Sequence, residues 1–150
     1  MSKTTDHLGR PIVVVTGIGI ITSLGVGRKD NWDALSAGRS GIHEIKRFPT
    51  DELKTRICGM VDFLGSSDKG PAALTYEMAE TTAIEALSEA GLDGGDFGGP
   101  LFLAAPPVEL SWRDRFDLYK MSAEDAGYRR LMAGAARPEA ARYFETTQFG

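Results

Sequence analysis

The sequence has one cysteine and no long apolar run, and each of these shortages excludes a class of protein. With Cys58 as the only cysteine among 150 residues, an internal disulfide framework is excluded and a reducing compartment is indicated. No stretch approaches the roughly 18–20 apolar residues that a membrane-spanning helix needs. Residues 1–10 are polar and lack the apolar region of a signal peptide. We therefore expect a cytoplasmic protein that does not enter a membrane.

Clusters of basic residues are also missing. The 17 lysines and arginines are scattered among 21 acidic residues, giving a net charge of −4. Binding to nucleic-acid phosphates requires clustered positive charge, so no nucleic-acid partner is expected. The two histidines, His7 and His43, have no cysteine or carboxylate at ligand spacing, and we expect no metal site. A hydrophobic content of 42% is typical of a globular protein with a core.

The stretch from Ile12 to Gly25 organises the rest of the chain. Its four β-branched apolar residues, 12–15, predict a strand buried on both faces, and Gly17 and Gly19 end that strand. A dinucleotide-binding fingerprint would need glycine or alanine where Thr22 stands. A short-chain dehydrogenase motif or a nucleophile elbow would need glycine where Ile21 stands. The glycines therefore indicate close packing, with a nucleotide-binding module as the alternative.

Further elements follow in the pattern of an α/β fold. Asp30 is the expected N-cap of a short helix that carries Trp32 and Leu35 inward and ends at Gly38. Residues 39–55 read as a loop. Strands are predicted at 56–61 and 101–105, and short helices after Ser111 and from Pro138.

A long helix over 73–90 is the clearest element. Pro71 suits its first turn and Gly91 its C-cap. Residues that recur at a spacing of about 3.6 positions form one stripe, which we expect to face the core. They are Tyr76, Ala79, Ala83, Leu87 and Ala90. The carboxylates of Glu77, Glu80 and Glu85 are expected on a solvated face. Cys58, in the middle of a strand, reads as a small buried hydrophobe and not as an acyl-accepting thiol.

Taken in order, several segments resemble the N-terminus of the β-ketoacyl-[acyl carrier protein] synthases of the fatty-acid type. The resemblance rests on residues 13–19, 21–25, 31–42 and 58–61. It implies a thiolase-like layered α-β-α-β-α fold, of which residues 11–150, after a flexible stretch at 1–10, would be an incomplete N-terminal portion.

The same resemblance implies a function. The whole protein would catalyse a decarboxylating Claisen condensation of acyl and malonyl thioesters on acyl carrier protein, as a homodimer without a cofactor. The family's catalytic cysteine, histidines and lysine would follow Gly150, so no catalytic residue is assigned here. Val108 and Leu110 follow two prolines that depart from the family pattern. They are candidates to line an acyl pocket, with ordinary packing as the favoured alternative. A non-catalytic partner subunit of the chain-length-factor type is the alternative.

Overall fold

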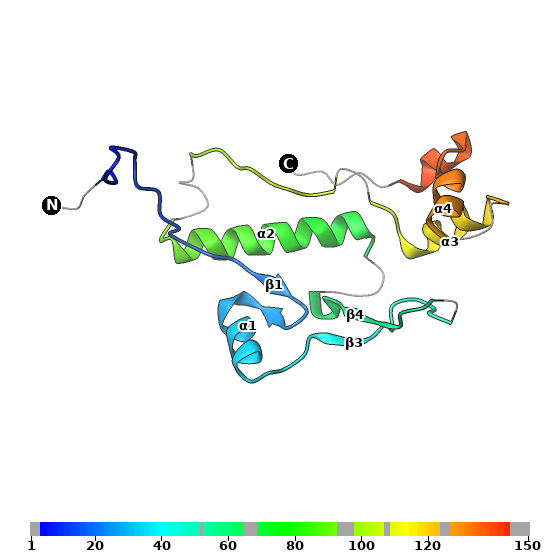
Figure 1. The fold of residues 1–150 in the computed structure, drawn as a ribbon, viewed down its shortest axis with the longest axis horizontal. Helices are drawn as coiled ribbons and strands as arrows, with labels where there is room; N and C mark the ends of the chain where they lie inside the picture. The colour runs from blue at the N-terminus through cyan, green and yellow to red at the C-terminus, as the bar shows by residue number, and fades with distance from the viewer. Residues whose placement is uncertain are drawn as a thin grey trace.

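The computed structural model describes residues 4–51, 53–64, 69–92, 98–106, 109–123 and 127–144. Helix α2 (Pro71–Glu89) lies along the middle of an elongated molecule (Figure 1). Helix α1 (Gly27–Ser36) and the small strands lie on one side of α2, and segment 98–106 lies on the other. Helices α3 (Trp112–Lys120) and α4 (Gly127–Ala135) lie near the end where α2 begins. The described part is thus a mixed α and β structure arranged around one helix.

Two small antiparallel sheets are present among the described residues. Strand β1 (Ile21–Thr22) pairs with β2 (Gly25–Val26), and β3 (Ile42–Glu44) pairs with β4 (Ile57–Gly59). Strand β4 confirms the predicted strand at 56–61. Strand β3 falls inside the segment that was predicted as a loop, and that prediction is wrong. A strand of three residues has too little alternation to be recognised before its partner is known.

Helix α2 confirms the predicted long helix and its ends. Pro71 occupies the first turn, and the Leu92 amide donates to the Leu87 carbonyl at 3.0 Å beyond Gly91, which has a φ of +72°. The prediction of a buried inner stripe is wrong, because no residue of α2 is buried and Tyr76 is 38% exposed. The face that receives the N-terminal segment carries Thr82 and Ala86 instead.

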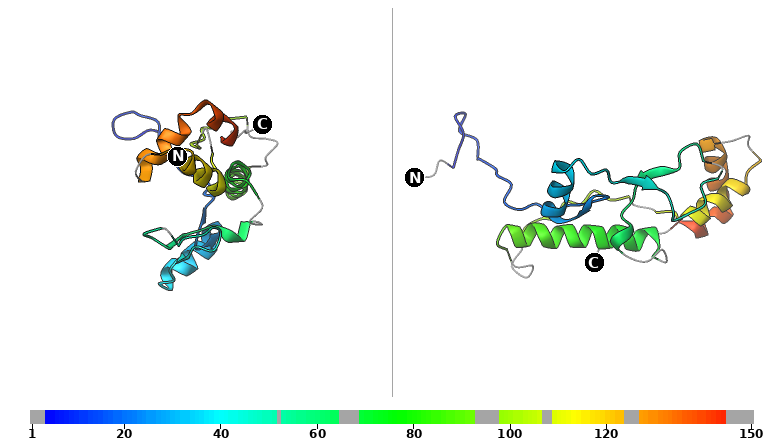
Figure 2. Two further views of the ribbon diagram at one scale, coloured as in Figure 1. Left: turned by 90° about the vertical axis from the view of Figure 1, so that its right-hand side faces the viewer. Right: turned by 90° about the horizontal axis from the view of Figure 1, so that it is seen from below.

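Segment 12–20 lies along α2 in an extended conformation, as the blue chain beside the helix in Figure 2 shows. Gly17 and Gly19 approach the helix backbone so closely that an added Cβ would collide with the carbonyl oxygens of Ala86 and Thr82. The interpretation of these glycines as packing residues is confirmed. The space that their missing side chains leave is filled by α2.

The two apolar strands predicted at 12–15 and 101–105 are not formed. Both segments are extended but outside the sheets, and Val13 and Phe102 are 90% and 91% exposed. An apolar run favours strand geometry, yet a strand exists only when a neighbour supplies the hydrogen bonds. Among the described residues neither segment has such a neighbour in a sheet.

Helix α1 begins earlier than predicted and buries a different face. It starts at Gly27, so Asp30 lies in its first turn and is not the N-cap. Trp32 and Leu35 were expected inside but are 67% and 62% exposed, whereas Asn31 is buried. The Asn31 amide donates to the carbonyls of Gly25 and Gly27 at 3.0 and 2.8 Å. Because this polar side chain ties the helix to the β1–β2 hairpin, it and not Trp32 turns inward.

Helices α3 and α4 and the 3-10 helix η2 (Pro138–Tyr143) form the other packed region. Leu118 of α3 is completely buried. Gly134 of α4 meets it so closely that an added Cβ would touch the Leu118 backbone. The Ser111 hydroxyl accepts the Asp114 amide at 3.1 Å and caps α3, which confirms the predicted helix start. The residues between Ala123 and Gly127 lie outside the described part.

Candidate functional site

A large cavity lies between the loop after β3, the start of α2, and helices α3 and α4. It is only partly enclosed and has a volume of about 1530 Å³. Its walls include three aromatic rings that share one face of α3 at spacings of four and three residues, those of Trp112, Phe116 and Tyr119. Phe48 crosses from the loop and places its ring 6.2 Å from that of Trp112, which in turn meets Phe116 edge to face at 6.0 Å. The interior of the cavity is therefore mainly apolar.

Positive charge surrounds this apolar interior. The basic side chains that line the cavity are Lys46, Arg47, Lys54, Lys69, Arg113 and Arg115. No aspartate or glutamate lines it in the part of the chain that the structure describes. Two of the six cations form ion pairs, Arg47 with Asp62 at 2.8 Å and Lys69 with Glu77 at 2.5 Å.

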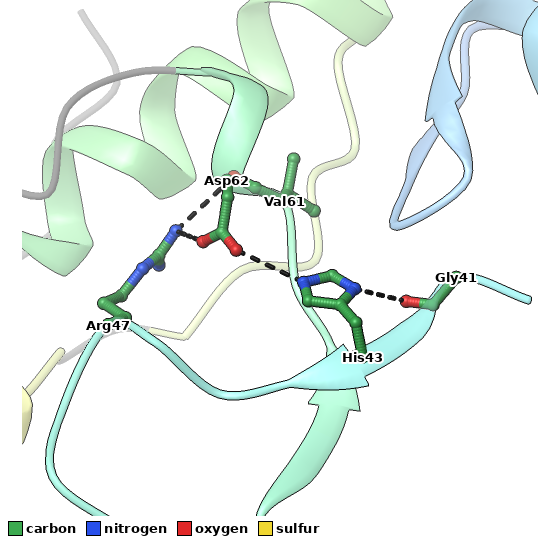
Figure 3. Close-up of polar contacts among 5 residues, drawn as sticks. All are labelled: Gly41, His43, Arg47, Val61 and Asp62. Atoms are coloured by element: carbon green, nitrogen blue, oxygen red, sulfur yellow. Dashed lines mark hydrogen bonds and ion pairs between the residues drawn. The ribbon is translucent and has the colours of Figure 1, made fainter.

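The Asp62 carboxylate contacts His43 of β3 and Arg47 of the loop after β3 (Figure 3). One carboxylate oxygen accepts from Arg47, and the other lies 3.3 Å from Nε2 of His43. The Nδ1 atom of His43 lies 3.2 Å from the Gly41 carbonyl, so both ring nitrogens face acceptors. Because a neutral imidazole carries one N–H, both contacts can be hydrogen bonds only when His43 is protonated. The arrangement fixes the start of the 3-10 helix η1 (Asp62–Leu64) against β3.

Cys58 lies directly across the ladder from His43, in the middle of β4. Its thiol is free and half-buried. The histidine ring nitrogens are engaged by Gly41 and Asp62, so His43 is not positioned as a base for this thiol. The interpretation of Cys58 as a structural residue agrees with this geometry.

The predicted carboxylate face of α2 has a role that the sequence did not reveal. Glu85 accepts from the backbone amides of Ile20 and Arg28, at 3.0 and 3.1 Å. Glu89 accepts from the Ile18 amide at 2.7 Å and also pairs with the Arg28 guanidinium. The expectation that Glu85 belongs to a purely solvated face is wrong. These carboxylates accept hydrogen bonds from backbone amides of the extended segment 12–20, which lies outside the sheets. They also accept from the first turn of α1, where negative charge is favourable.

Of the two residues predicted to line an acyl pocket, Leu110 lines the cavity and Val108 lies outside the described residues. Whether this cavity takes an acyl chain remains a prediction. The basic side chains were missed because they come from positions as distant as Lys46 and Arg115. The sequence by itself shows only the part of this basic lining that lies within one helix, where Arg113 and Arg115 flank the aromatic residues of α3.

The chain was compared with known protein families. The model described as "Beta-ketoacyl synthase, N-terminal domain" matches residues 10–97, which is more than half of the chain. The chain belongs to the β-ketoacyl synthase family. The match includes the glycine junction, β1 to β4 and all of α2, and it ends before α3 and α4, which contribute the rest of the cavity wall.

Curated relatives of this synthase family support the same assignment. The chain is 38% identical over 87 residues to the tetracenomycin polyketide synthase ketoacyl synthase alpha subunit of Streptomyces glaucescens, covering 54% of the chain and 20% of the relative. It is 33% identical over 87 residues to 3-oxoacyl-[acyl-carrier-protein] synthase 2 of Vibrio cholerae, covering 54% and 21%. The matched region thus spans about a fifth of these relatives. No solved structure matches the chain.

Within the described residues, no cluster of three or more histidine, cysteine or acidic side chains has the geometry to hold a metal ion. No helix in the same residues combines the length and apolar character needed to cross a bilayer.

Proposed function

We propose that the chain is the N-terminal portion, residues 11–150, of a β-ketoacyl synthase that condenses acyl and malonyl thioesters carried by acyl carrier protein. The observation that carries this proposal is the family match over residues 10–97, together with relatives named as fatty-acid and polyketide ketoacyl synthases. In the condensation, a cysteine thiolate accepts the acyl group, the malonyl thioester loses carbon dioxide, and the resulting carbanion attacks the acyl thioester.

In this proposal, residues 11–150 contribute to the fold of the synthase and supply no catalytic residue. The only cysteine, Cys58, lies within a strand, where neither a helix N-terminus nor an available base would activate its thiol. We therefore place the nucleophile and the groups that stabilise the oxyanion in residues that follow Gly150. The whole protein is proposed to be a cytoplasmic homodimer, within a thiolase-like layered fold.

The geometry disfavours the nucleotide-binding alternative at the glycine junction. A pyrophosphate bound there would need open backbone amides, yet the Ile18 and Ile20 amides already donate to Glu89 and Glu85. The partner-subunit alternative concerns residues outside this sequence. A Thr-Ala-Cys type motif encoded after Gly150 would favour the enzyme, and its absence would favour the non-catalytic subunit.

Residues 1–150 alone are expected to show no decarboxylation of malonyl-[acyl carrier protein], because the groups that would stabilise the carbanion left by loss of carbon dioxide are proposed to follow Gly150. Release of carbon dioxide from labelled malonyl-carrier protein measures this, with Cys58→Ala as the matched variant. Release above the rate without protein would contradict the proposal, and its loss in Cys58→Ala would trace the activity to Cys58. Equal background release from both proteins would support it.

A further inference from the structure

We draw no further inference here: the strongest candidate, the apolar surface of the exposed extended segments 12–15 and 101–103 beside α2, carries none because nothing in the structure shows what covers these two segments.

Discussion

Replacement of Gly19 by alanine is expected to lower the free energy of unfolding by about 2–3 kcal/mol. The added Cβ would lie 1.8 Å from the carbonyl oxygen of Thr82, and the next closest atoms also belong to the helix backbone. A backbone carbonyl inside a helix cannot rotate away as a flexible side chain can. Segment 12–20 would have to move off α2, which would also strain the contact between the Ile20 amide and Glu85.

Urea unfolding of Gly19→Ala measures this loss, with Gly98→Ala as the matched control. Gly98 has no atom within 4 Å of its would-be Cβ and no positive φ, so alanine fits there. Its substitution is expected to change stability by less than about 0.5 kcal/mol. Similar unfolding midpoints for the two variants would show that segment 12–20 does not rest on α2.

Replacement of Gly134 by alanine is expected to destabilise the protein by about 2 kcal/mol, against the usual helix preference. In an exposed helix interior the same change stabilises by about 1 kcal/mol, because glycine carries the larger entropic cost. Here the Cβ would lie 1.9 Å from the Leu118 carbonyl oxygen in α3. Leu118 is completely buried, so the displaced backbone would take the centre of this packed region with it.

Gly134→Ala is expected to lower the stability of the protein, whereas helix preference alone would raise it, so the direction of the change distinguishes the two effects. Thermal unfolding of Gly134→Ala can be compared with Ala133→Gly, which tests helix preference one residue earlier in α4. Ala133→Gly is expected to cost about 1 kcal/mol through preference alone. A stabilised Gly134→Ala would mean that α3 and α4 do not approach at this point.

Features determined by neighbouring residues could be predicted from the sequence. The ends of α2 follow from Pro71 and Gly91, and the start of α3 follows from Ser111, because caps act within one turn. Features determined by distant partners could not. Strand β3 exists only through pairing with β4, and Asn31 is buried only because the β1–β2 hairpin supplies acceptors for its amide.

The same contrast between neighbouring and distant determinants applies to the candidate site. Leu110 lines the cavity, and its predicted place in an acyl pocket stays a prediction. The basic lining was not predicted, since Lys46, Lys54 and Arg115 line one cavity only after the loop, α2 and α3 have packed together. Glu85 likewise acts on amides 57 and 65 residues away along the chain, which no helical periodicity reveals.

The central claim is that Gly17 and Gly19 are packing residues held against α2. Nuclear Overhauser effects in the isotope-labelled chain test it most directly. The claim predicts cross-peaks from the α protons of Gly19 to the α proton of Thr82, and from those of Gly17 to the amide proton of Ala90, whose backbone atoms lie nearest the two glycines. Absence of both sets, while the sequential signals of α2 show an intact helix, would contradict it.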